Sequence, residues 1–506
     1  MGGRRRASAG AVLAVVGFGV FVAADDLTVA TTMLRQIIGD LDIPLPEGFD
    51  RAAWIVNGYL IAYVAVMPIA GRLGDVFGRR RVFVTALALF GIGSLLIPHA
   101  TTLGPFLAGR VLTALGGGAM VPVALSAVGD VYREGERGRA LGILGALETL
   151  GWVWGPLFGA LLVRFLDWRW QFHLNVPLAV IGIGLAWWAM RDLGEPQPGR
   201  RLDLPGAAAM TIGLVALATG LLELGDIATA SDLAGLGRSG GMPVWPLFLV
   251  GLSSLAVFAV WERRAPDPLL EPAVVGSGEV PVALVLNLLL GAVLAVAMVN
   301  APLFVNLVVE NDLRRAAVVS GWVLTALTAS MALTSPVGGW LTDRTSRRLP
   351  VLTGAVIATV GLALAGLQWQ VGVSAWAMSA HLVMVGGGLG LMTAPITAAV
   401  VDTVPADRRG VGAALVVVAR LVGLTVGLAG LTAWALHRYG TLRSEIVLPP
   451  LTDPAYPDAA AAAQASLSAT VLAETFLISA AVALLSAVVA AWLRTQRAST
   501  ATPPTR

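Results

Sequence analysis

Five charged side chains lie inside otherwise apolar segments of this 506-residue chain, and they are its first candidates for chemistry. Asp25 and Asp26 are adjacent in "FVAADDLTVA", and Arg110, Glu148 and Arg420 are single charges in later apolar runs. Carboxylates in such places can take up and release protons, and guanidinium groups can hold them as ion pairs. If the runs cross a membrane, each charge costs roughly 2.5–3.5 kcal/mol at a helix centre, so we interpret all five as functional candidates.

The composition indicates that these runs do cross a membrane. Hydrophobic residues make up 57% of the chain and charged residues 13%, about half the usual share of a soluble protein. The apolar runs are roughly 18 to 30 residues long, enough to cross a ~30 Å hydrocarbon core. We therefore predict an all-α polytopic membrane protein.

Several other classes of protein are disfavoured. The chain has no cysteine, so disulfides, thiolate metal sites and cysteine nucleophiles are excluded. Its arginines are scattered through short loops and do not cluster as a nucleic-acid site would require. The sequence shows no metal-ligand cluster, phosphate-binding loop or nucleophile–His–acid set. We expect neither an enzyme nor a bound metal or cofactor.

Hydropathy predicts fourteen membrane spans. They lie near residues 10–34, 52–71, 82–99, 103–129, 138–163, 173–190, 204–225, 243–262, 279–307, 316–341, 350–368, 372–401, 409–437 and 468–493. With the N-terminus inside, the inner loops and tails hold 23 arginines and the outer loops eight. Because positive charge is retained inside, both termini are expected in the cytoplasm and the chain in the cytoplasmic (inner) cell membrane.

The chain also contains an internal repeat. "GRLGDVFGRRR" at 71–81 returns as "GWLTDRTSRRL" at 339–349, each directly after a predicted span. This parallel duplication predicts two pseudo-symmetric six-helix bundles, at 1–192 and 279–506, with two inserted helices in 193–278. Transporter sites commonly lie between two such halves, near the midplane.

The repeat places the charged residues in relation to one another. Glu148 and Arg420 are 272 residues apart and occupy equivalent positions in the two halves. We expect them to face each other across a central cavity, with Asp26 as a second partner of Arg420. Arg110 is expected on the cavity side, and Asp25 at the cavity wall or a polar neighbour. A coupling role and a permanent buried salt bridge both remain open.

The repeated loop predicts a gate at the cytoplasmic side. Glycines allow a tight turn, the aspartate can cap a helix or pair with an arginine, and the arginines can reach an acid at a nearby span end. Such pairs would close that side and break when it opens. A solvated positive loop is the alternative. The gate candidates are Gly71, Asp75, Gly78, Arg79, Arg80 and Asp130, with Asp343, Arg347 and Asp402 in the second half.

Small residues predict close helix packing in the fifth span, and proline predicts a kink there. The alternative is generic packing of small residues. The residues concerned are Gly142, Gly151, Gly155, Pro156 and Gly159.

The last span is longer than a membrane requires. Residues 458–493 contain no glycine or proline, and as a helix capped by Asp458 they would extend about 54 Å. We predict an extended outer hairpin at about 434–470, with a fraying helix end as the alternative.

These motifs resemble the major facilitator superfamily, and specifically its fourteen-span drug:proton antiporter branch. Residues 71–81 are similar to the superfamily's loop motif, residues 142–160 to the exporters' antiporter motif, and "WRWQFHLNVP" at 168–177 to a further motif of the branch. The resemblance implies the major facilitator fold and proton-driven export by alternating access. The long outer hairpin resembles the lipid-exporting members, which are associated with triacylglycerol-type lipids.

The resulting hypothesis is a proton-coupled exporter of hydrophobic or amphiphilic compounds, either drugs or lipids. Its expected partners are those compounds, protons and membrane lipids, with an extracytoplasmic lipid carrier as a candidate and no nucleic acid. A dedicated exporter of triacylglycerol-type lipids is the first alternative. A proton-coupled importer of a small solute and a non-transporting membrane scaffold also remain open.

Overall fold

The computed structural model describes residues 8–43, 49–193, 202–225, 245–269, 275–310, 312–446, 449–450 and 453–493, and these residues form fourteen α-helices and no strand. Thirteen helices are long and apolar enough to cross a membrane, and the other, α7, is apolar over Leu204–Gly220. The protein is therefore a multi-pass membrane protein. The helices are α1 (Ala9–Asp40), α2 (Phe49–Phe77), α3 (Arg79–Leu96), α4 (Leu103–Val131), α5 (Arg137–Phe165), α6 (Arg169–Ala189), α7 (Leu204–Gly225), α8 (Trp245–Glu262), α10 (Val280–Phe304), α11 (Leu313–Arg344), α12 (Arg348–Gln368), α13 (Ala375–Thr403), α14 (Arg409–Glu445) and α15 (Tyr456–Ala490).

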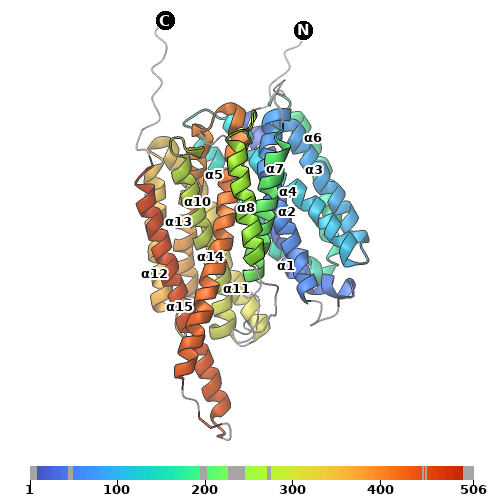
Figure 1. Ribbon diagram of the computed structural model, residues 1–506. Helices are drawn as coiled ribbons and strands as arrows, with labels where there is room; N and C mark the ends of the chain where they lie inside the picture. Colours follow the sequence, from blue (N-terminus) through green and yellow to red (C-terminus); the bar gives the residue numbers. More distant parts are fainter. Residues whose placement is uncertain are drawn as a thin grey trace, which may run out of the picture.

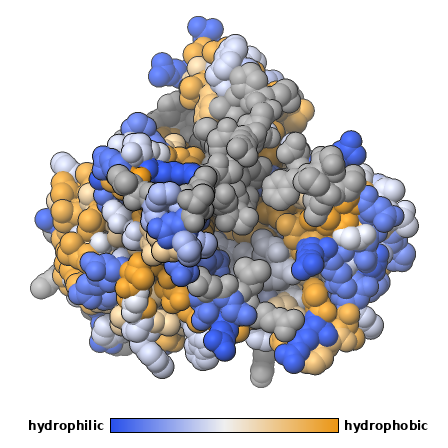
Figure 2. All heavy atoms as spheres, turned by 90° about the horizontal axis from the view of Figure 1, so that it is seen from below, coloured by the Kyte–Doolittle hydropathy of each residue, from blue (hydrophilic) through white to orange (hydrophobic). Residues whose placement is uncertain are grey.

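The helices run alternately up and down, and the two ends of the bundle differ (Figure 1). One end, here the motif end, carries the two repeated loops at 71–81 and 339–349. At the other end, here the hairpin end, α14 and α15 project beyond the remaining helices (Figure 1). Seen from the hairpin end, the described residues show hydrophilic and hydrophobic patches side by side (Figure 2).

Helix packing follows the internal repeat. In the first half α1 packs on α5, α2 on α4, and α3 on α4 and α6; in the second half α10 packs on α14, α11 on α13, and α12 on α13 and α15. The halves meet along two seams, α5 with α11 and α2 with α14. Of the inserted pair, α7 packs against α2 and α14, and α8 packs on α7, so the pair covers only the second seam. The boundaries 1–192, 193–278 and 279–506 stay a prediction.

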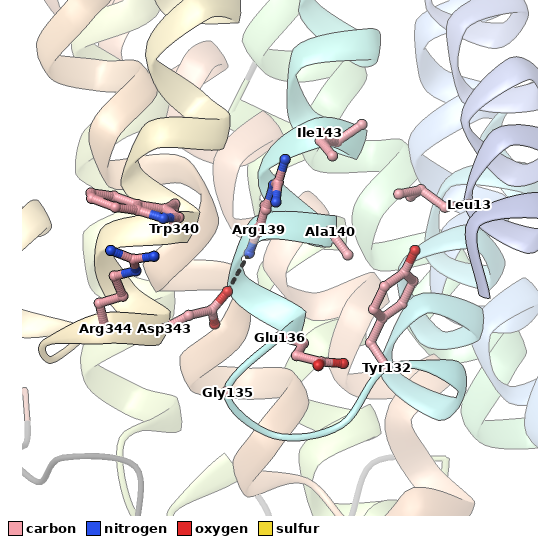
Figure 3. Close-up of a pocket in the computed structure, with 10 residues that line it drawn as sticks. All are labelled: Leu13, Tyr132, Gly135, Glu136, Arg139, Ala140, Ile143, Trp340, Asp343 and Arg344. Carbon is pink, nitrogen blue, oxygen red and sulfur yellow. Dashed lines mark hydrogen bonds between the residues drawn. The ribbon is translucent and has the colours of Figure 1, made fainter.

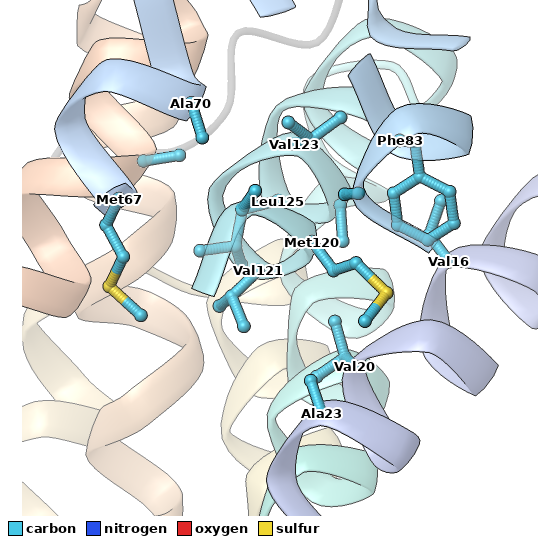
Figure 4. Close-up of a cluster of buried hydrophobic side chains, with 14 of the residues drawn as sticks. Val16, Val20, Ala23, Met67, Ala70, Phe83, Met120, Val121, Val123 and Leu125 are labelled. Atoms are coloured by element: carbon cyan, nitrogen blue, oxygen red, sulfur yellow. The ribbon is translucent and has the colours of Figure 1, made fainter. Parts of the chain in front are cut away.

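The interior of the first half is built from aliphatic and aromatic side chains of α1 to α6. Val16 and Val20 of α1 lie close to Phe83 of α3 and Met120 of α4, all nearly inaccessible (Figure 4). Lipid is as apolar as these side chains, so shape-matched packing of small and large residues holds the helices together.

Glycines set the closest helix contacts. A Cβ added to Gly142 of α5 would meet the carbonyl of Ser335 and the backbone of Pro336 in α11. A Cβ on Gly151, Gly155 or Gly159 would meet α1 instead. Helix α5 therefore packs tightly on both its own half and the other, with Pro156 inside a continuous helix.

The hairpin end shows the expected long helices. Helices α14 and α15 contain 37 and 35 residues, so each is roughly 50 Å long. Arg438 and Glu474 join them through two hydrogen bonds of 3.0 and 3.1 Å, beside packed Tyr439 and Val471. The predicted cap is wrong: Ala455 occupies the N-cap position, because α15 begins two residues earlier and Asp458 lies in its first turn.

We expect a valine at Gly142 to force α5 and α11 apart, because its branched side chain would meet backbone atoms that cannot rotate away. Overpacking of this kind costs roughly 1–3 kcal/mol, so the thermal unfolding midpoint of the purified protein should fall. Gly184→Val is the matched control, since a Cβ there has no atom within 4 Å. Equal midpoints for the two variants would contradict the close packing.

Candidate functional site

Glu148 of α5 and Arg420 of α14 form an ion pair between the two halves. Oε1 of Glu148 accepts a hydrogen bond of 2.5 Å from Nη2 of Arg420, and both side chains are buried. The Arg420 guanidinium lies 5.4 Å from the ring centre of Trp152. A cavity of about 20 Å³ adjoins the pair and is lined by Thr393 and Thr397. The two equivalent positions therefore meet, with opposite charges.

A second buried ion pair lies within the first half. Nη1 of Arg110 is 2.9 Å from Oδ2 of Asp26, and both side chains are almost inaccessible. Asn175 of α6 donates a hydrogen bond of 3.1 Å to the other carboxylate oxygen, and the guanidinium lies 4.1 Å from the Tyr59 ring centre. The predicted pairing of Asp26 with Arg420 is wrong, because α1 packs on α4 and brings Asp26 to Arg110.

Asp25 has an amide partner. Gln171 of α6 donates a hydrogen bond of 2.7 Å to Oδ2 of Asp25, whose Oδ1 is buried without a hydrogen-bond partner in the described protein. The sequence reasoning missed Gln171, Asn175 and Tyr59. The two amides are four residues apart on one face of an apolar span, and that spacing was the available signal.

At the motif end, each repeated aspartate caps a helix of the other half. Asp75 of α2 accepts hydrogen bonds from the backbone N–H groups of Gly410 and Val411, at 3.0 and 3.2 Å. Asp343 of α11 accepts them from Gly138 and Arg139, both at 2.9 Å. A carboxylate at a helix N-terminus satisfies free N–H groups and complements the helix dipole.

The two loop glycines have different roles. Gly78 has a φ of +91° and supplies the turn between α2 and α3. Gly71 lies inside α2, so its predicted place in a turn is wrong. A Cβ there would meet the carbonyl of Gly410, and the absence of a side chain lets α2 and α14 cross closely.

Asp130, at the motif end of the first half, pairs with arginines of both halves. Asp130 accepts from Arg79 of its own half at 3.2 Å and from Arg409 of the other half at 3.0 Å. Arg79 also pairs with Asp75. Arg80 was predicted to reach an acid but lies over the Trp187 ring, 4.4 Å from its centre.

The second half repeats this arrangement. Asp402 accepts from Arg137 at 2.7 Å and from Arg347 at 2.6 Å, and Arg347 also binds Glu279 at 2.5 Å. Burial alone would lower the pKa of Arg347, but the carboxylates of Asp402 and Glu279 outweigh it and hold that pKa above its usual value. The guanidinium stays charged, so these contacts depend on the acids.

These contacts hold the two halves together at the motif end. Asp75, Asp343, and the pairs of Arg137 with Asp402 and Arg409 with Asp130 all cross between the halves. Two repeated halves, joined by contacts at one end and by an ion pair midway, are the arrangement that membrane transporters commonly have.

The chain belongs to the Major Facilitator Superfamily, whose model matches residues 16–299 and 286–506. It is 34% identical to a triacylglyceride transporter of Mycolicibacterium hassiacum, over 88% of this chain and 83% of that one. It is 33% identical to a probable triacylglyceride transporter of Mycobacterium leprae, over 96% of this chain and 95% of that one. A triacylglyceride transporter of Mycobacterium tuberculosis is 35% identical over 87% of this chain and 84% of its own length.

Solved structures agree on the fold. A proton:xylose symporter aligns with a TM-score of 0.63 at 12% identity, covering 95% of this chain and 94% of that one. A human organic anion transporter aligns with a TM-score of 0.59 at 15% identity, covering 95% and 99%. The protein is thus a transporter of this superfamily by sequence and by fold.

We expect Asp343→Ala to open the motif end, because it removes two hydrogen bonds to a charged group, each worth about 1.5–3 kcal/mol. The chain has no cysteine, so Thr397→Cys provides a single buried reporter beside the central ion pair. Labelling by a membrane-impermeant thiol reagent applied at the motif end should accelerate about tenfold or more.

Asp458→Ala is the control for that experiment, since Asp458 is exposed at the hairpin end. Unchanged labelling in Asp343→Ala would show that the caps do not hold this end closed.

Proposed function

We propose that this protein exports neutral lipids of the triacylglyceride type and couples their movement to proton entry. The main support is its 33–35% sequence identity, over most of its length, to proteins named triacylglyceride transporters. The small cavity beside the central ion pair is lined mostly by valine and leucine, which suits an apolar cargo. The projecting hairpin of α14 and α15 would guide such a cargo away from the membrane, and an extracytoplasmic lipid carrier is its candidate partner.

The orientation follows from the loops. Arginine-rich loops favour the cytoplasmic side, so we place the motif end and both termini in the cytoplasm and the hairpin outside the inner membrane. The cross-half contacts at the motif end then describe a protein closed towards the cytoplasm.

The buried ion pairs supply the coupling step. Protonation removes the charge of a carboxylate and with it the attraction that holds an arginine. Glu148 is the first candidate, because its partner Arg420 belongs to the other half and the pair therefore ties the halves together. Asp26 with Arg110 is the second, and Asp25 lies beside it. Each proton that enters supplies about 2.3 kcal/mol per 100 mV of membrane potential.

In this proposal the protein transports lipid by alternating access. In the outward-open state, protons from outside neutralise the acids and loosen the central pairs, and the lipid leaves along the hairpin. The motif end then opens, the protons pass to the cytoplasm, and a new lipid enters. Re-formed pairs return the protein to the state described here.

The test uses proteoliposomes that carry a fluorescent triacylglyceride in their membrane. The solution outside is acidic and contains acceptor vesicles. We expect wild-type protein to transfer the lipid, and Glu148→Gln to reduce transfer to the level of empty liposomes, because the amide can neither titrate nor bind Arg420 as an ion. A protonophore should have the same effect on the wild type.

Glu445→Gln is the matched control, an acid at the end of α14 on the hairpin side. Full transfer by Glu148→Gln would refute the coupling role. Transfer of a lipophilic cation without any transfer of triacylglyceride would replace the lipid proposal with drug export.

A further inference from the structure

A pocket of about 430 Å³ opens at the motif end, beside the seam that α7 and α8 leave uncovered. It lies between the start of α5 and the end of α11, with α1 and the α4–α5 turn on its other side (Figure 3). None of the central acids lines it. Ten residues do: Leu13, Tyr132, Gly135, Glu136, Arg139, Ala140, Ile143, Trp340, Asp343 and Arg344.

Two guanidinium groups give the pocket its binding chemistry. Arg139 belongs to α5 and Arg344 to α11, so each half contributes one. Arg344 lies over the Trp340 ring, 4.4 Å from its centre. Among the described residues neither guanidinium has a carboxylate partner. Arg137, two residues before Arg139, and Arg347, three residues after Arg344, both have one.

Among the described residues, neither acid of the pocket forms an ion pair with Arg139 or Arg344. The two oxygens of Asp343 are already engaged by the backbone N–H groups of Gly138 and Arg139. Glu136 lies beside Tyr132, on the side away from Trp340 and Arg344 (Figure 3). An anion between Arg139 and Arg344 would therefore meet two charged donors, the arrangement that binds phosphate oxygens strongly.

Apolar side chains line the rest of the pocket, and an apolar stripe continues from it towards the middle of the membrane. Leu13 and Ile143 form its inner side. On α11, Val337 and Leu333 follow Trp340 at intervals of one helical turn, with 49% and 74% of their surface exposed. Tryptophan and arginine at this depth are typical of the membrane interface, where an acyl chain would descend along such a stripe.

We propose that this pocket binds the phosphate group of an anionic phospholipid, with Arg139 and Arg344 on the phosphate and an acyl chain along Val337 and Leu333. Basic pockets between membrane helices on the cytoplasmic side bind such headgroups. Binding of a phospholipid at this site does not depend on which cargo the protein carries.

The position of the two arginines adds a conformational consequence. They come from different halves, so one phosphate can bridge them only while α5 and α11 are together at the motif end. A ligand that binds one state better shifts the population towards it. The bound lipid therefore favours the state closed at the motif end and reinforces the cap formed by Asp343.

The test is thermal unfolding of the full-length protein in neutral detergent, followed by its tryptophan fluorescence. Phosphatidylglycerol, phosphatidylcholine and inorganic phosphate are added in separate titrations. We expect phosphatidylglycerol to raise the unfolding midpoint by several degrees and phosphatidylcholine to raise it much less. The Arg139→Gln, Arg344→Gln double variant should lose the phosphatidylglycerol shift while keeping the midpoint of the lipid-free protein.

Two further variants sharpen the result. Arg81→Gln removes an exposed motif-end arginine outside the pocket and should keep the full shift. Arg139→Lys with Arg344→Lys keeps both charges and should restore part of it. An equal shift with inorganic phosphate would make free phosphate the ligand of the same site. A full phosphatidylglycerol shift in the double glutamine variant would overturn the proposal.

Discussion

The cost of keeping charge inside a membrane controls this structure. Each buried carboxylate or guanidinium needs a partner, and removing one member of such a pair typically costs about 3–5 kcal/mol. Asp26 meets that need inside its own half, through Arg110 and Asn175. Glu148 meets it across the two halves, through Arg420. In the proposed mechanism, protonation of Glu148 would therefore weaken a contact between the two bundles.

The internal repeat places equivalent contacts at the motif end of the two halves. Asp75 caps the helix that begins at Arg409, and Asp343 caps the helix that begins at Arg137, so each half closes the other by the same interaction. Close crossings at glycines make those caps reachable. The inserted pair α7 and α8 breaks this symmetry by covering one seam, which leaves the α5–α11 seam facing the membrane.

The sequence predicted the residues that occupy equivalent positions in the two repeats. It did not predict the contacts that depend on which helix faces pack together. Equivalent positions placed Glu148 opposite Arg420, and the loop motif predicted that Asp75 caps a helix or pairs with an arginine; it does both. The partner of Asp26 depended on which face of α1 meets α4, which hydropathy does not encode. Gln171 was missed because an uncharged amide costs less free energy in a membrane span than a charged group does, so it stands out less in the sequence.

The central claim is that lipid leaves only as protons enter. The most direct measurement is the pH of the lumen in proteoliposomes that enclose a pH-sensitive dye, with an acidic exterior and acceptor vesicles outside. With triacylglyceride in the membrane, the lumen should acidify faster than without it, and the difference should vanish in Asp26→Asn or Glu148→Gln. Lipid transfer at the wild-type rate with no lipid-dependent acidification would contradict the account.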